Sequence, residues 1–373
     1  HVIHAQPLRN FLGKTCNRIL IFDPEEIWFE KTLQGAVIIL AEKKTVSKKP
    51  ADGLGIIKIK GDDFVTKHPQ QYFLNANYLN GKTVEGKWTY ALLTKDEFKL
   101  LGKLKENKCV HSFNDIANVD VGIVTGANKF FLVPNEIVEQ YELQEFAHPM
   151  FGRSEHCPGI IYNDEQHRNN AKKRYPTNFL WFKVDSVENL TELQKEYILL
   201  GERNNLHRRY KCRVRSPWYT VPSVYATEIG MLTRSHDFPR LILNDINAYT
   251  TELAYRIKVE KLDSRLLVYS FINSLTALSA ELEGRHYGGG VLELVPSEIE
   301  KLLVPIPQDV SIDLNMLNQK FYNKDKYILQ NQDNVILTSI GLSEGEIGTL
   351  QYAWNRLKQR RQREKDVPST QFQ

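Results

Sequence analysis

Residues 119–133 read VDVGIVTGANKFFLV, and residues 283–307 read EGRHYGGGVLELVPSEIEKLLVPIP. In both stretches, glycines stand beside polar or basic residues within apolar text that is typical of strands. Glycine tolerates positive φ and lets another backbone approach closely. The two stretches therefore predict strand-rich structure whose glycine turns present polar groups, and they raise the question of what those turns bind.

The length and charge of the chain limit the number of domains and the kinds of partner to expect. The chain has 373 residues, of which 42% are hydrophobic, enough for a large core divided between two or three domains. Lys and Arg number 49, against 45 Asp and Glu. Because this excess is small, it does not by itself indicate nucleic acid, and the distribution of the cations along the chain matters more.

The four cysteines show no metal-binding pattern. Cys16, Cys109, Cys157 and Cys212 include no C-x-x-C pair, and no histidine lies at zinc-finger spacing from them. We therefore expect no metal and a reduced, cytoplasmic protein. No stretch approaches the ~20 apolar residues of a membrane helix, so no membrane partner is expected. The first residue is His1 rather than Met, and we expect the chain to be a piece of something longer.

The N-terminal third predicts a small α/β unit. The apolar run VIIL within residues 33–44 is typical of a strand buried on both faces. Alternation in residues 55–64 favours an edge strand with lysines on its wet face, after a polar loop at 43–53. The remaining expected elements are a helix ending at Gly13, a strand over 17–22 and a helix over 90–106.

The rest of the chain divides into strands and then helices. Residues 110 to about 305 hold short apolar runs punctuated by Pro and Gly, which predicts a strand-rich region. Helical spacing interrupts it at 190–203 and 264–284, and the tail from 333 to 365 is also helical. The fold class that follows is α+β, with helices at the C-terminus.

A basic segment occupies residues 203–219, RNNLHRRYKCRVRSPWY. The portion YKCRVR alternates like a strand, which would place its cations on one face at a spacing suited to phosphates. The alternative is a solvated strand face that pairs with local acids, but no Asp or Glu occurs between residues 203 and 227. The candidate DNA-binding residues of this segment are Arg208, Arg209, Lys211, Arg213, Arg215 and Trp218.

Each glycine stretch also supplies candidates. In the first, a strand is expected to turn at 126–128 and continue as a strand, with the polar residues at the tip; an ordinary hairpin turn is the alternative. In the second, a helix is expected to end near Gly284, and the three glycines lead into a strand, which is unlike a P-loop or a dinucleotide fingerprint. A linker, or turns that only shape the core, are the alternatives. The candidates are Thr125, Gly126, Asn128, Lys129, Arg285, His286, Tyr287, Gly288, Gly289 and Gly290.

Five motifs in order carry a resemblance to a known family. They are VGIVTGANKFFLV, FGRSEHCPG, YKCRVRSPWYTVP, LILNDINAYTTELAY and EGRHYGGGVLELVPSEIEKLLVPIP. Together they resemble the C-terminal half of adenine-N6 DNA methyltransferases of type II restriction–modification systems, the TaqI-like γ class. FGRSEHCPG adds Arg153 to the residues that the resemblance implies for DNA binding.

The resemblance implies a division of the chain. Residues 1–45 look like the end of a Rossmann-like catalytic domain, 46–109 like a connecting segment, 110–310 like a target recognition domain and 311–373 like a helical tail. Without its parallel strands, the remnant should expose apolar surface at residues 36–41 or find a substitute partner for this strand. Double-stranded DNA is the implied partner, in a prokaryotic cytoplasm.

The catalytic motifs of that family are missing from this sequence. It contains neither the glycine loop for S-adenosylmethionine nor an N-P-P-Y motif for a flipped adenine, and no G-x-S-x-G, H-E-x-x-H or paired carboxylates. We therefore expect no catalytic residue and no cofactor in this chain, and no activity in isolation. S-adenosylmethionine would serve the complete enzyme, whose catalytic half lies on the same longer polypeptide or on a separate subunit. The alternatives are a DNA specificity or adaptor subunit, and a fused enzyme with a nuclease.

Overall fold

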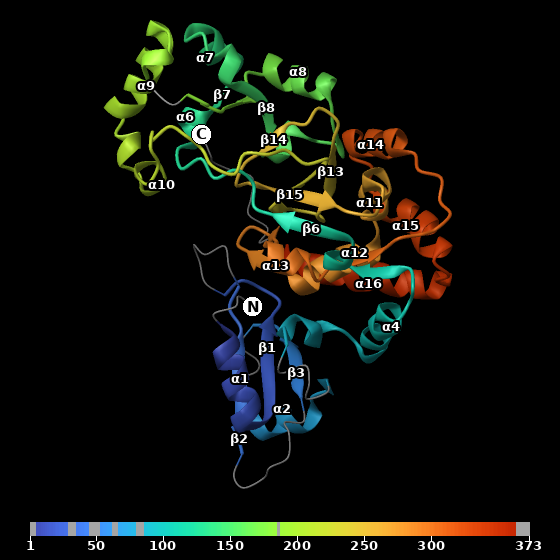
Figure 1. Ribbon diagram of the computed structural model, residues 1–373. Coiled ribbons are helices and arrows are strands. Elements are labelled where there is room, and N and C mark those ends of the chain that lie inside the picture. Colours follow the sequence, from blue (N-terminus) through green and yellow to red (C-terminus); the bar gives the residue numbers. More distant parts are fainter. Residues whose placement is uncertain are drawn as a thin grey trace.

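Figure 1 shows the computed structural model, which describes residues 5–28, 35–44, 53–61, 66–79, 86–184 and 187–362. Several separate sheets are joined by short helices, and the chain ends in a group of helices, so the expected α+β class with C-terminal helices is confirmed. Besides the helices introduced in the following paragraphs, the described residues form α5 (Phe113–Ile116), α7 (Asn135–Gln140), α8 (Asp164–Lys172), α11 (Ser264–Ser270), α13 (Pro296–Ile299), α14 (Leu314–Tyr322) and α15 (Ile328–Ser339).

The N-terminal sheet has four strands in the order β2-β1-β3-β4. Strand β1 pairs antiparallel with β2 and parallel with β3, and the expected boundary at residue 45 passes through this sheet. Its fully buried residues Ile19 and Leu20 form the centre of the unit. The elements are α1 (Gln6–Thr15), β1 (Cys16–Pro24), β2 (Ile38–Lys43), β3 (Leu54–Ile59), α2 (Pro69–Asn75) and β4 (Tyr78–Leu79).

Three expectations for this unit were wrong. Gly13 does not end the first helix, which continues to Thr15. Strand β2 is an edge strand whose residues alternate between half-buried and exposed, rather than a strand buried on both faces. Strand β3 lies between β1 and β4, so it is not an edge strand; residues 62–64 of that prediction lie outside the described residues. Alternation of apolar and polar residues indicates which face of a strand is exposed to solvent, but it does not indicate the order of strands in a sheet.

The expected apolar exposure of residues 36–41 is confirmed. Val37 is 47% exposed and Ile39 is 40% exposed. Within the described sheet, no strand pairs with the outer edge of β2, so this edge offers backbone groups to another chain segment.

A short connection joins this unit to the strand-rich body. It consists of the 3₁₀ helix η3 (Trp88–Leu92) and helix α4 (Lys95–Lys105), which begins with a capping box at Thr94. Thr89 donates a hydrogen bond of 2.6 Å to the carbonyl of Leu282, and the hydroxyl of Tyr90 donates one of 2.8 Å to Glu283. These bonds dock the connection on the end of the central helix α12.

The middle of the chain contains two larger sheets, which confirms the strand-rich region. The five-stranded sheet has the order β6 (Ala117–Asp120), β15 (Ala254–Val259), β11 (Ile229–Leu232), β13 (Leu241–Asn244) and β9 (Ile161–Tyr162). The four-stranded sheet has the order β14 (Tyr249–Thr250), β8 (Ala147–Phe151), β10 (Asn178–Leu180) and β7 (Leu132–Val133). Smaller sheets join β12 (Arg234–Ser235), β17 (Val291–Glu293) and β16 (Arg285–Tyr287), and β18 (Leu303–Pro305) with β5 (Val110–Ser112).

Helix α12 (Ser274–Glu283) is the centre of the main core, because every one of its residues is buried. It packs along α16 (Glu344–Arg361) at the C-terminus. The expected single helix over 264–284 is two helices, since Asn273 leaves the helix and its side chain accepts from the backbone N–H of Thr276 at 2.9 Å. Asparagine favours such capping over a position inside a helix.

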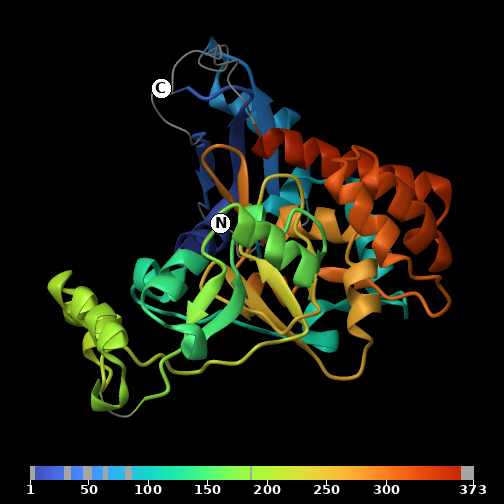
Figure 2. The same ribbon diagram turned by 90° about the horizontal axis from the view of Figure 1, so that it is seen from above.

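A second core supports α9 (Glu192–Arg203) and α10 (Tyr210–Arg213), together with the four-stranded sheet. Figures 1 and 2 show these two helices at the periphery of the molecule, away from the C-terminal helices. The basic segment therefore lies on an outlying part of the strand-rich body.

Candidate nucleic-acid interface

The first glycine stretch forms a turn followed by a short helix, so the expected second strand was wrong at this point. Gly126 has a φ of +79°, and α6 (Asn128–Phe131) begins two residues later. Thr125 is buried and its hydroxyl donates to the side-chain oxygen of Asn128 at 2.5 Å. The amide of Asn128 in turn donates to Glu252 at 2.9 Å. These two side chains therefore shape the turn, while Lys129 is exposed.

The basic segment is helical rather than a strand. It forms the 3₁₀ helix η7 (Leu206–Arg208) and then α10, which is anchored by the buried Cys212. Lys211, Arg213 and Arg215 consequently do not share a strand face. Four of the candidate cations in this segment are exposed, and none of them forms an ion pair with another described residue: Arg208, Arg209, Lys211 and Arg213.

Arg215 has a different role from its neighbours. Its guanidinium donates to the carbonyls of Val124 and Thr125 at 2.7 and 2.8 Å, and burial lowers its pKa. Gly126 packs against the same segment, because a Cβ on it would lie 2.6 Å from the Cβ of Lys211. The structure thus brings the glycine turn and the basic segment together, and Arg215 is the tie between them.

Tyr210 is a residue that sequence reasoning did not include among the candidates. It is 65% exposed, with the Lys211 ammonium 5.8 Å and the Arg213 guanidinium 5.5 Å from the centre of its ring. An exposed aromatic ring between two cations offers a stacking surface beside phosphate-binding groups. The position of Tyr210 between basic residues is the feature of the sequence by which it could have been found. Trp218, by contrast, is half-buried, packs on Phe130 and donates to Glu202 at 3.2 Å.

Three hollows surround the glycine turn. Lys211 and Arg215 line one of about 610 Å³, Lys129 and Arg209 line one of about 410 Å³, and Lys129 and Arg153 line one of about 390 Å³. Arg153 is exposed and pairs loosely with Glu155 at 3.3 Å. We call Lys129, Arg153, Arg208, Arg209, Lys211 and Arg213 the cationic cluster, since all six are exposed around this turn.

A buried histidine lines the third hollow. Neither ring nitrogen of His156 has a hydrogen-bond partner among the described residues, although the ring stacks on Tyr175. Burial lowers the pKa of His156 to about 4, so the ring is neutral at pH 7. It therefore adds no positive charge to the cationic cluster.

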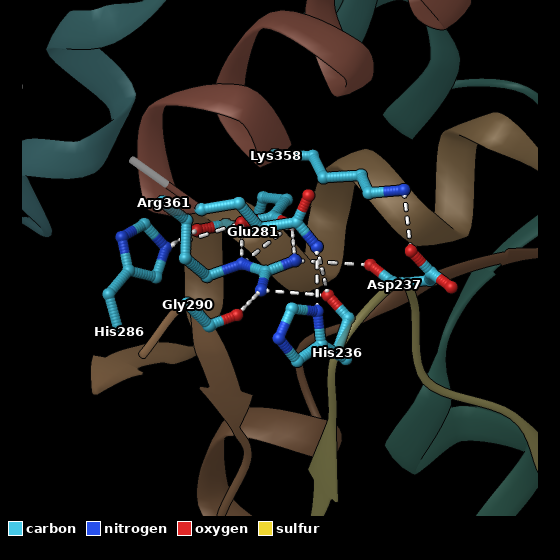
Figure 3. A network of polar contacts seen from close by, with 8 residues as sticks. His236, Asp237, Glu281, His286, Gly290, Lys358 and Arg361 are labelled. Carbon is cyan, nitrogen blue, oxygen red and sulfur yellow. Dashed lines mark hydrogen bonds and ion pairs between the residues drawn. The ribbon is translucent and has the colours of Figure 1, made fainter. Parts of the chain in front are cut away.

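The second glycine stretch forms the expected strand and turn after a helix that ends at Gly284. Its polar side chains are engaged within the chain: Arg285 pairs with Glu298 at 3.0 Å. His286, which Figure 3 shows beside Glu281, lies 3.4 Å from that carboxylate. Tyr287 is 39% exposed, with Arg234 5.8 Å from its ring.

The glycines of this turn differ from one another. Gly290 is buried with a φ of +69°, its carbonyl accepts from Arg361, and a Cβ on it would lie 3.0 Å from the Cα of Gln362. The close backbone approach at Gly290 is therefore to the end of α16. Gly289 has a φ of +73° with open space around it, and Gly288 is half-buried. That both glycine stretches and the basic segment line one cleft stays a prediction.

The described residues also bear on metals and membranes. None of them form a group of three or more His, Cys, Asp or Glu placed to hold a metal ion. Within the same residues, no helix has the length and apolar character that crossing a membrane requires. All four cysteines are free thiols.

Comparisons with known proteins give the context of this site. Residues 85–337 match the family model described as type II methyltransferase M.Eco57I, C-terminal domain. The chain is 22% identical over 340 residues to the type II methyltransferase M.AccI of Acinetobacter calcoaceticus. The match covers 86% of this chain and 59% of M.AccI, so the chain spans little more than half the length of that relative.

Two solved structures are also similar. The type IIG restriction endonuclease BpuSI gives a TM-score of 0.47 at 11% identity, covering 98% of this chain and 46% of that one. The type IIL restriction-modification enzyme MmeI, in complex with DNA, gives 0.44 at 11% identity, covering 94% and 47%.

Proposed function

Because this chain belongs to the family of the type II methyltransferase M.Eco57I C-terminal domain, we propose that it is the part of a restriction–modification methyltransferase that grips and reads duplex DNA. The observation that carries the proposal is the cationic cluster around the Gly126 turn. Helix α10, which carries Lys211 and Arg213, lies at the periphery of the fold (Figure 2), and the exposed ring of Tyr210 lies beside these two cations.

The cluster has the properties that phosphate binding requires. Exposed Lys and Arg side chains that release counterions on contact with phosphates supply most of the affinity for duplex DNA. Five of the six members form no ion pair with another described residue, and the sixth, Arg153, pairs with Glu155, so most of the charge of the cluster is available to a partner. The tie from Arg215 to the glycine turn holds the segment in place, which limits the entropy lost on binding.

We assign the methyl transfer to a catalytic half outside this chain. In an open α/β sheet, ligands bind beyond the carboxyl ends of the parallel strands. At that end of β1, the carboxylate of Asp23 is buried and pairs with Arg360 of α16 at 2.6 Å. The carboxylate at this position is therefore engaged within the chain rather than available to S-adenosylmethionine, which supports a cofactor site in the other half. In the complete enzyme, that cofactor would methylate N6 of an adenine flipped out of the duplex, as the TaqI-like resemblance implies.

The exposed edge of β2 supports the same division of labour. Val37 and Ile39 present apolar surface on a strand whose outer edge is free within the described sheet. The catalytic half would cover this edge, whether it is joined to the chain or is a separate subunit. A specificity subunit that recruits a methyltransferase would use the edge in the same way.

Duplex binding at several salt concentrations tests the proposal. Fluorescence anisotropy with a labelled mixed-sequence duplex gives the slope of log K against log salt, to which each phosphate contact contributes about −0.9. Changing Arg208, Arg209, Lys211 and Arg213 together to alanine should flatten the slope by about 3.6 and weaken binding to all sequences.

A matched control removes the same charge elsewhere. Helix α4 lies at the lower right in Figure 1, away from α10. The helix and the turn after it carry four exposed lysines, namely Lys95, Lys99, Lys105 and Lys108. Their joint change to alanine should leave the slope near that of the wild type. Equal slopes for the wild type and the cluster variant would show that the cationic cluster is only a solvated face.

A further inference from the structure

A separate hollow of about 820 Å³ lies between the turn after β12, the connection from α14 to α15, and α16. No member of the cationic cluster lines it. Its volume is within the range of roughly 300–1,000 Å³ that small-molecule sites occupy. The hollow is therefore large enough for a ligand of its own.

Cations outnumber acids around this hollow. Five cationic side chains line it, and the acidic side chains that line it are Asp237 and Asp325. Arg234 is paired with Glu293 at 2.6 Å, and Lys358 with Asp237 at 2.6 Å. The exposed lysines Lys324 and Lys326 form no ion pair with the described residues, so the rim keeps a positive charge for an anion.

The inner wall of the hollow is aromatic and contains unused donors. Phe238 lies between Phe321 and Trp354, with ring centres 6.1 Å from each. The indole N–H of Trp354 is buried without a hydrogen-bond partner among the described residues, and so is the Nε–H of Arg240. The guanidinium carbon of Arg240 lies 5.3 Å from the centre of the Phe321 ring, and Nη2 of the same group donates to the carbonyl of Cys157 at 2.8 Å.

Buried donors without partners cost free energy unless a ligand or water accepts from them. The combination of an aromatic wall, two such donors and a cationic rim is complementary to a planar, acceptor-bearing ring that carries a phosphate. We propose that this hollow binds a nucleotide, with its phosphate at Lys324 and Lys326 and its ring against the aromatic wall. The nucleotide is either free in solution or part of a single strand of nucleic acid.

Calorimetric titration of the chain with four probes tests the proposal. The probes are adenosine 5′-monophosphate, adenosine, inorganic phosphate and a single-stranded tetranucleotide. The monophosphate should bind more tightly than adenosine or phosphate, because only it reaches both the rim and the wall. If the tetranucleotide alone binds, the source of the nucleotide is nucleic acid. Failure of both to bind at millimolar concentration overturns the proposal, as does equal binding of adenosine and its monophosphate.

Two variants locate the binding in this hollow. Lys324→Gln with Lys326→Gln should raise the dissociation constant about tenfold or more, since charge-assisted contacts to phosphate are lost. The matched control is Lys172→Gln with Lys173→Gln, two exposed lysines at the end of α8 that do not line the hollow. Trp354→Phe keeps an aromatic ring and removes the N–H, and it should also weaken binding. Equal effects of the two lysine pairs would mean that only net charge matters and would refute the site.

This inference does not depend on the proposed DNA recognition by the cationic cluster. The lysine pair at the hollow should leave the salt slope for duplex DNA unchanged if the nucleotide is free. The two proposals can therefore fail separately.

Discussion

Replacing Arg361 by methionine should destabilise the fold strongly, because this side chain ties three segments together (Figure 3). Its guanidinium makes three contacts of 2.7–3.1 Å with the carboxylate of Glu281, and it donates to the carbonyls of His236, Asp237 and Gly290. The side chains of Arg361 and Glu281 are 0% and 1% exposed. The end of α16 is thereby fastened to the glycine hairpin.

The magnitude follows from the burial of this pair. Removing one partner of a buried ion pair leaves an uncompensated charge and typically costs about 3–5 kcal/mol. Methionine fills most of the volume, so the electrostatic loss should dominate over any cavity. Replacing Glu281 as well, with Arg361→Met and Glu281→Leu together, removes the stranded charge. The double variant should recover most of the loss, although three carbonyls still lack their donor.

The pH dependence provides an independent check. Burial alone would raise the pKa of Glu281, but hydrogen bonds from His286 and Arg361 outweigh it and hold the pKa below 4.5. The stabilisation from Glu281 in the wild type is therefore present above pH 4.5 and is lost as the pH falls through the lower folded value. Without Arg361, burial should raise this pKa, so the cost of the variant should be largest near pH 8 and shrink as the pH falls toward 4.5.

Urea denaturation followed by circular dichroism at pH 8 and pH 5 measures these differences. The reasoning predicts a large loss for Arg361→Met at pH 8, a smaller loss at pH 5, and recovery in the double variant. A loss below about 1 kcal/mol that does not change with pH would refute it, since that is the size expected of an exposed pair.

Three further changes separate contact from structure. Arg215→Lys should lower the free energy of unfolding by about 1–3 kcal/mol, because one ammonium cannot serve both carbonyls, and should leave the salt slope for DNA as in the wild type; the reverse result would make Arg215 a DNA contact. Tyr210→Ala should weaken DNA binding by about 1–3 kcal/mol through lost stacking, with an unchanged melting temperature. Since the pKa of His156 is lowered to about 4 from 6.5, the folded protein should lose stability as the pH falls between these values. His156→Gln should flatten that part of the stability curve measured by urea denaturation, and an equally steep curve would contradict the burial of a neutral ring.

The sequence alone determined much of the local structure. Strand β1 and strand β17 after the three glycines were predictable, because alternation and glycine placement act within a few residues. The end of α12 at Gly284 and the C-terminal helices follow from equally local signals, helical spacing and stop residues. The class α+β was accordingly correct, and the cations of the candidate site were recognisable by their clustering.

Tertiary structure alone decided how those elements are used. The segment YKCRVR has the alternation of a strand, yet it is helical, because Cys212 is buried and Arg215 bonds to carbonyls about 90 residues earlier in the chain. The close approach at Gly290 is to a helix end 71 residues away, through Arg361. Periodicity reports burial and exposure along one segment, whereas such contacts depend on which distant segment packs beside it. The physical reason is that a hydrogen bond or an ion pair between remote residues leaves no regular spacing in the sequence.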